Sequence, residues 1–135
     1  MDQMSIVQYQ FPSRPGATEY CLFPRELEKD GLILFHATSA KNAPDIIKDG
    51  FKIPDPSGEN GLASVSFAKR SVSALTHAMS KRHAEPGDWV VFAVQYRSLD
   101  REGLVNNLCD INDFTLTPSP LIVGYCTVPA SYEHV

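Results

Sequence analysis

The sequence predicts a single α+β domain, built on a curved and mostly antiparallel sheet with short helices. The chain has 135 residues, which is room for one domain, since domains usually run to roughly 100–200 residues. Four segments rich in branched and aromatic residues, bounded by Gly, Pro or Asp, are typical of strands: residues 32–36, 64–68, 89–96 and 121–128. Helical patterns lie between them, so strands and helices are expected to share one core.

The N-terminal part of the domain, residues 1–30, is expected to form a short strand within 5–11 and a covering arm. A first helix is predicted at residues 43–49. Pro44 suits the first turn of that helix, and Gly50 suits the left-handed position after its last turn. The helix would connect the first two strands of the sheet.

A second helix is predicted at about residues 71–82, because Val72, Leu75 and Met79 recur at helical spacing. We expect these three side chains to form its buried stripe. Short strands are expected between the strand at 89–96 and the last strand at 121–128. The predicted order therefore alternates strands and helices before it ends in strands alone.

The charge balance argues against a nucleic-acid partner. Twelve Lys and Arg against sixteen Asp and Glu give a net charge of -4, the wrong sign for a protein that gains affinity by neutralising phosphates. Duplex DNA is therefore not expected as a partner. No apolar run reaches the ~18 residues of a membrane span, and no secretory signal begins the sequence. We expect a cytoplasmic protein with no membrane partner, although export without a cleavable signal would leave the same composition.

The cysteines predict free thiols. There are three, Cys21, Cys109 and Cys126, without the spacing of a zinc site. An odd number also argues against a disulfide framework. No metal is therefore expected.

Small hydroxyl residues follow a histidine directly after the first main strand, in the order His36, Ala37, Thr38 and Ser39. We expect His36 to end the strand at the mouth of the sheet. There Thr38 and Ser39 could hydrogen-bond a polar ligand, and Ala37 would let the ligand approach the backbone. A structural alternative is that His36 bonds a neighbouring carbonyl while Thr38 and Ser39 cap the next helix.

This segment resembles the first motif of the ADP-ribosyltransferase superfamily, a His-Gly-Thr-like turn, a helix with Asn or Ala and Ile, and a closing Gly-Phe. The matching residues here are His36, Ala37, Thr38, Asn42, Ile46, Gly50 and Phe51. The family's second motif, a Tyr-Phe-Ala strand followed by a Ser-containing helix, is similar to residues 61–68 and 71–77. The resemblance covers roughly residues 31–128 and is to the histidine-tyrosine-glutamate branch. That branch includes diphtheria toxin, the poly(ADP-ribose) polymerases and the small rifamycin-modifying transferases.

The resemblance implies that NAD is the co-substrate and that His36 orients a ribose hydroxyl. The residues expected to bind NAD are His36, Ala37, Thr38, Ser39, Ser66, Phe67, Ser73 and His77. Ser66 stands where the family has the tyrosine that packs on nicotinamide, and His77, on the same helix face as Ser73, is predicted to replace it. The alternatives are a solvated His77 and a Phe67 that belongs to the core.

The carboxylate of the family's triad is missing from its usual place, because residues 117–120, at the start of the late strand, contain none. The rifamycin-modifying relatives use an aspartate after the third strand, which makes Asp100 the first catalytic candidate. Asp113 and Asp110, which precede the late strand, are the other candidates. Each could instead be a turn or capping residue.

We therefore expect a mono-ADP-ribosyltransferase that transfers ADP-ribose from NAD to an unknown acceptor, which could be a protein, a small molecule or a nucleic acid. Chain elongation to poly(ADP-ribose) is not expected without the glutamate. The alternative is an inactive domain of the same fold that binds NAD, ADP-ribose or a protein partner. An RNA-directed relative is disfavoured by the acidic charge balance.

Overall fold

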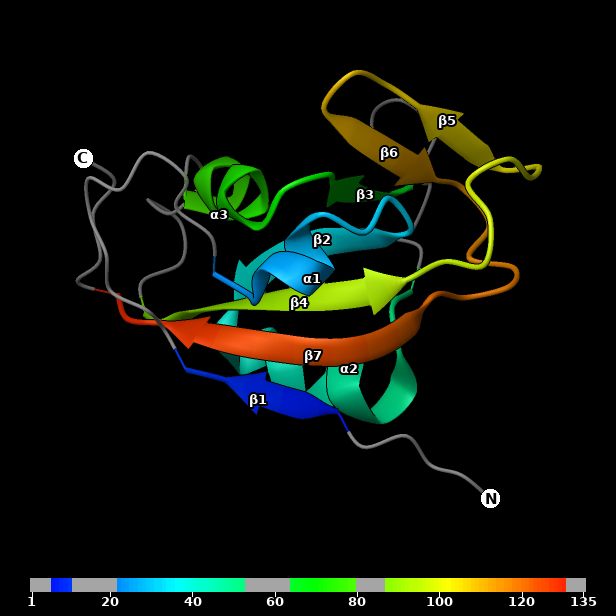
Figure 1. Cartoon of the computed structure of the whole chain (residues 1–135). Coiled ribbons are helices and arrows are strands. Elements are labelled where there is room, and N and C mark those ends of the chain that lie inside the picture. The colour runs from blue at the N-terminus through cyan, green and yellow to red at the C-terminus, as the bar shows by residue number, and fades with distance from the viewer. Residues whose placement is uncertain (1–5, 11–21, 53–63, 80–86, 131–135) are drawn as a thin grey trace.

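The computed structural model describes residues 6–10, 22–52, 64–79 and 87–130. Within these residues it confirms an α+β domain with a seven-stranded sheet and short helices (Figure 1). The strands are β1 Val7–Tyr9, β2 Ile33–Ser39, β3 Val65–Ala68, β4 Trp89–Gln95, β5 Leu104–Asn106, β6 Asp110–Asp113 and β7 Leu121–Val128. The helices are α1 Arg25–Glu28, α2 Ala43–Asp49 and α3 Ser71–Met79, with a 3₁₀ turn at Ala40–Asn42.

The sheet has the strand order β1-β7-β4-β2-β3-β6-β5 and is mostly antiparallel, as expected. Only the β1–β7 pair is parallel among the described strands. The pairing of β2 with β4 is continuous, from Ile33 opposite Gln95 to Ser39 opposite Trp89. The pairing of β2 with β3 is a single position, Phe35 opposite Ala68. The sheet therefore opens beyond this position, and β3, β6 and β5 turn away from the other four strands (Figure 1).

Helices cover both faces of the sheet, which explains why β4 is an uninterrupted apolar run. Trp89, Val91 and Ala93 belong to one core cluster, which also contains Leu75 of α3 and is contacted by Leu27 of α1. The alternate β4 residues Val90, Phe92 and Val94 belong to the other cluster, which Ile46 of α2 contacts. In Figure 1, α1 accordingly lies in front of the sheet and α2 behind it.

The predicted helix at 43–49 is confirmed at both ends. Pro44 lies in the first turn of α2, where its missing N–H costs no hydrogen bond. Gly50 ends the helix with a positive φ of 81°, which glycine adopts without steric cost, but its ψ of -177° lies outside the predicted left-handed helical conformation.

The buried face of the second predicted helix is corrected by the structure. Leu75 is buried as predicted, but it shares the core-facing side of α3 with Ser71, Ala74 and Ala78, whereas Val72 is half-buried. Small alanines allow α3 to pack closely on β2, so the apolar stripe lies about one residue away from the predicted one. The side chain of Met79 and residues 80–82 lie outside the description.

The first main strand is longer than predicted, so His36 does not end it. β2 continues through Ala37 and Thr38 to Ser39, because these residues pair with the first half of β4. His36 is nevertheless close to an opening, because the β3 side of β2 has no partner beyond Phe35 among the described strands. His36 therefore reaches the opening from the edge of β2, where β3 separates from it, and not from the end of the strand.

The arm residue Glu28 fixes the start of α3. Its carboxylate accepts hydrogen bonds from the backbone N–H of Ser71, at 3.3 Å, and from the Ser71 hydroxyl. A negative charge is favourable at a helix N-terminus. The contact holds α1 against α3 and so helps to set the position of the following turns of α3.

Candidate functional site

A cavity of about 1050 Å³ lies where the sheet splits, and is called here the large cavity. α2 contributes Asp45 and Ile46 to its wall, and α3 contributes Ser73 and His77. Because these helices cover opposite faces of the sheet, the large cavity runs around the unpaired edge of β2. The split therefore exposes residues of both β2 faces to one space.

His36 lines this space and bridges the split. Its Nδ1 lies 2.8 Å from the carbonyl oxygen of Ser66 on β3. A carbonyl only accepts hydrogen bonds, so Nδ1 carries the hydrogen and Nε2 of the neutral ring keeps a lone pair. Burial lowers the pKa of His36, the hydrogen bond to Ser66 raises it, and the charge of nearby His77 lowers it, with a net lowering. The neutral ring is thus an acceptor at neutral pH.

Two phenylalanines hold the imidazole of His36. The Phe51 ring lies edge-on to it with centroids 5.2 Å apart, and the Phe67 ring lies 5.6 Å away. Phe51 also lines the large cavity. Phe67 is 0% exposed and belongs to the core cluster that α2 covers. It therefore packs against His36 from the core and is not part of the wall of the large cavity. This position agrees with the alternative in which Phe67 is a core residue.

The hydroxyl residues after His36 all line the large cavity. Thr38 Oγ1 accepts a hydrogen bond from Asn42 Nδ2 at 3.2 Å. Ser39 occupies the N-cap position of the 3₁₀ turn, but its side chain makes no capping hydrogen bond. The capping role of these two residues is therefore not observed, whereas the predicted bond of His36 to a carbonyl is present.

The structure brings Ser66, Ser73 and His77 to the same cavity as His36. Ser66 is half-buried on β3, while Ser73 and His77 lie on the exposed face of α3. The predicted helical face that carries Ser73 and His77 thus turns toward the opening. Trp89 also lines the large cavity, and its side-chain Nε1 is buried without a hydrogen-bond partner in the described part of the chain.

Carboxylates reach the large cavity from two sides. Asp45 and Asp49 line it from α2, and Asp110 lines it from the first position of β6. Asp110 lies opposite Ala68 of β3, and its Oδ1 accepts a hydrogen bond from Asn107 Nδ2 at 2.9 Å. This bond orients the Asp110 carboxylate while leaving its second oxygen for a ligand.

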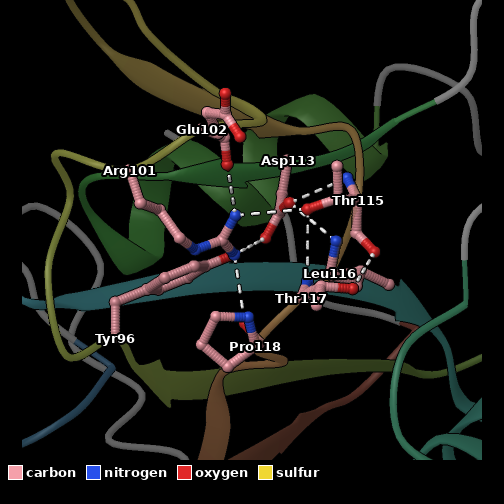
Figure 2. Close-up of polar contacts among 8 residues, drawn as sticks. All are labelled: Tyr96, Arg101, Glu102, Asp113, Thr115, Leu116, Thr117 and Pro118. Atoms are coloured by element: carbon pink, nitrogen blue, oxygen red, sulfur yellow. Dashed lines mark hydrogen bonds and ion pairs between the residues drawn. The ribbon is translucent and has the colours of Figure 1, made fainter.

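The second catalytic candidate, Asp113, lies in a buried polar network away from the large cavity (Figure 2). Its Oδ2 accepts hydrogen bonds from Tyr96 at 2.8 Å and Arg101 at 2.7 Å. Its Oδ1 accepts the backbone N–H groups of Thr115 and Leu116. With both oxygens in use, Asp113 stabilises the loop after β6 and is not available to a substrate in the large cavity.

Burial alone would raise the pKa of Asp113. The hydrogen bonds from Leu116, Tyr96, Thr115 and Arg101 together lower the pKa by more than burial raises it, so the net shift is downward. Burial is the largest cause of a raised pKa at Tyr96, and the hydrogen bond to Asp113 raises this pKa further. Asp113 therefore stays ionised and the Tyr96 phenol stays neutral. Asp113 is thus a structural anion, and the neutral Tyr96 phenol donates a hydrogen bond to it.

The first candidate, Asp100, is exposed and does not line the large cavity. The start of β7, where the family resemblance places a glutamate, lies at the other end of the sheet. There Leu121 pairs with Gln95, the last residue of β4, whereas the large cavity contacts Trp89, the first. Of the three aspartates named as candidates, the one that lines the large cavity is Asp110 of β6, the strand that pairs directly with β3.

The described residues contain no group of three His, Cys, Asp or Glu side chains that could hold a metal ion. Cys109, exposed at the wall of the large cavity, and Cys126, buried, are free thiols, while Cys21 lies outside the description. Cys126 is a core residue with 0% exposure, and this burial raises its pKa to about 11. No helix in the described ranges is long and apolar enough to span a membrane.

The sequence alone assigns no site role to several residues of the large cavity, among them Asp45, Asp49, Trp89 and Cys109. The period-two alternation of a strand at residues 110–113 is the sequence signal that could have assigned Asp110 and Asp113 to opposite faces. Ile111 and Asp113 are buried, while Asp110 and Asn112 are half-buried. Strand alternation therefore turns Asp113 to the core with Ile111 and leaves Asp110 on the accessible face.

No known protein family, curated protein or solved structure matches this chain.

Proposed function

We propose that the chain is an NAD-dependent mono-ADP-ribosyltransferase, which transfers ADP-ribose to an acceptor and releases nicotinamide. The observation that carries this proposal is that His36, Ser66, His77 and Asp110, which come from four different elements, line one cavity. The resemblance of residues 34–51 to the first motif of the family supports the same function. The acceptor is not identified by either observation.

His36 orients the ribose in this proposal. Its Nδ1–H is held by the Ser66 carbonyl, and the free lone pair on Nε2 accepts a hydrogen bond from a ribose hydroxyl. The backbone at Ala37 holds the nicotinamide carboxamide, as the family resemblance implies. His77, from α3, takes the place of the missing aromatic ring and stacks on the nicotinamide.

The reaction breaks the bond between the ribose C1′ and the nicotinamide nitrogen. The bonding electron pair leaves with nicotinamide, which becomes a neutral pyridine, and positive charge develops on the ribose. The Asp110 carboxylate stabilises that charge. A lone pair on the acceptor then forms the new bond to C1′, and the proton of the acceptor passes to Asp110.

The size of the large cavity agrees with a dinucleotide substrate. Its volume of about 1050 Å³ is at the upper end of ligand pockets, which span roughly 300–1,000 Å³. A smaller ligand would leave much of this space filled with water. The remaining volume and the open side give the acceptor a route to the ribose.

A second candidate function is binding of NAD or ADP-ribose without turnover. It is favoured by a specific pair of observations: neither Asp100 nor Asp113 reaches the large cavity, and Ser66 provides no ring to grip the leaving nicotinamide. Both functions require His36 at the ribose, and they differ in whether Asp110 supplies the charge. Turnover, and not affinity, distinguishes them.

The experiment uses NAD labelled in the ADP-ribose part, incubated with the purified chain and a lysate, followed by separation into protein, nucleic-acid and small-molecule fractions. We expect label in one fraction with the wild type and none with His36→Ala. Thr76→Ala, on an exposed α3 position outside the large cavity, serves as the matched control. Binding of NAD without transfer or nicotinamide release would favour the second candidate, and the absence of binding would reject both.

A further inference from the structure

A second cavity, of about 810 Å³, lies at the opposite end of the sheet from the large cavity. Gln95, the last residue of β4, lines the second cavity, whereas Trp89, the first, lines the large one. Six residue steps along a strand separate the two positions by about 20 Å. A ligand in the second cavity therefore does not occupy the proposed NAD site.

Among the described residues, those that line the second cavity include two arginines, Arg97 and Arg101, and no Asp or Glu. This is unusual in a chain whose net charge is -4. Ser98 and Ser119 line the same cavity, and the Ser98 hydroxyl, which accepts a hydrogen bond from the Asp100 N–H at 3.0 Å, keeps its own hydrogen to donate. The lining therefore presents hydrogen-bond donors and positive charge, which suit an anion.

The two arginines differ in their hydrogen-bond partners. Arg101 already donates to Asp113 at 2.7 Å and to the carbonyl oxygen of Pro118 at 3.1 Å, so its charge is balanced and its position fixed. Arg97 is exposed and makes no hydrogen bond or ion pair with any described residue. An anion in the second cavity would give Arg97 the partner that the described residues do not provide.

The rest of the wall is apolar. Leu32, Pro118, Pro120 and Leu121 contribute to it, and Leu121 is 46% exposed, which is high for a large apolar side chain. The Tyr96 ring also lines the second cavity, with the Arg101 guanidinium 5.7 Å from its centroid. Such a wall gains free energy by covering an apolar group.

From this combination we propose that the second cavity binds a small organic anion, in which a carboxylate or phosphate head is attached to an apolar group. The head is held by the Arg97 guanidinium and the Ser98 and Ser119 hydroxyls. The apolar part lies against Leu121 and the neighbouring prolines. This site is additional to the proposed transferase function and does not depend on it.

The test is an NMR titration of the full chain, labelled with ¹⁵N, with phenyl phosphate and, separately, with benzoate. We expect at least one of these anions to shift the backbone amides of Ser98, Ser119 and Leu121 in a saturable way. The preferred head group tells whether the natural ligand is a phosphate ester or a carboxylate. Phenol, which has the ring without the charge, is expected to bind at least tenfold more weakly.

The variant Arg97→Gln removes the unpaired charge from an exposed position and leaves the Arg101–Asp113 pair intact. It is expected to weaken binding about tenfold, the equivalent of one charge-assisted hydrogen bond. Arg70→Gln, an exposed arginine that lines neither cavity, removes the same charge as a control and should bind like the wild type. The proposal is overturned if neither anion binds there, if phenol binds equally well, or if Arg97→Gln keeps the wild-type affinity.

Discussion

The imidazole Nδ1 of His36 lies 2.8 Å from the carbonyl oxygen of Ser66, so a side chain joins β2 to β3 just where their backbone pairing ends at Phe35 and Ala68. The bond fixes the tautomer of His36 and at the same time closes the inner end of the split. His36 therefore helps to set the geometry of the large cavity and is also the residue proposed to bind a ribose there.

The first prediction concerns ligand binding at His36. We expect His36→Ala to reduce the affinity for NAD at least tenfold, because the variant loses the acceptor at Nε2 and the bond that orients it. Isothermal titration calorimetry of both proteins measures the difference, and circular dichroism verifies that the variant is folded. Equal affinities would remove His36 from the binding site.

The second prediction concerns the missing aromatic residue. Ser66 lines the large cavity and is half-buried, so a larger side chain can project into the opening. We expect Ser66→Tyr to tighten nicotinamide binding about three- to tenfold, the effect of one aromatic contact. Thr76→Tyr, which places a tyrosine outside the large cavity, should leave the affinity unchanged. Unfolding of Ser66→Tyr would mean that this position tolerates no ring, and the predicted equivalence with the family tyrosine would fail.

The third prediction concerns stability and its dependence on pH. Asp113 is 0% exposed and paired with Arg101, so Asp113→Asn should lower the free energy of unfolding at neutral pH by about 3 kcal/mol. Because the folded-state pKa of Asp113 lies below its unfolded value, this stabilisation is present above about pH 4 and is lost as the pH falls through the folded pKa.

Urea unfolding at several pH values measures this effect. The difference in unfolding free energy between wild type and Asp113→Asn should shrink as the solution is acidified. Asp100→Asn, at an exposed aspartate, is the matched control and should change stability by less than about 0.5 kcal/mol. A pH-independent difference between wild type and Asp113→Asn would show that packing, and not charge, accounts for the loss.

Much of the fold could be predicted from the sequence because its signals are local. Pro44 and Gly50 bracket α2, and the apolar run of β4 follows from burial on both faces. The length of β2 could not be predicted, since Ala37, Thr38 and Ser39 extend the strand only because β4 pairs with them.

The residues predicted on β2 and α3 lie together at the large cavity, whereas on β6 the sequence named Asp110 without distinguishing it from Asp113. His36 and Thr38 are close in sequence, and helical spacing places Ser73 and His77 on one face. The position of Asp110 depends instead on the pairing of β6 with β3, which is a long-range contact. Sequence alone therefore offered Asp100, Asp110 and Asp113 as candidates, and only the sheet order separates them.

The most direct test of the proposed function is the rate of nicotinamide release from NAD by Asp110→Asn, measured beside wild type, Asp45→Asn and Asp100→Asn. Asparagine keeps the size of the side chain and removes the charge. The proposal predicts that Asp110→Asn binds NAD like the wild type but turns it over about 10²- to 10³-fold more slowly, while the other two variants keep most of the rate. Full turnover by Asp110→Asn would contradict the role of Asp110 as the carboxylate that stabilises the ribose cation.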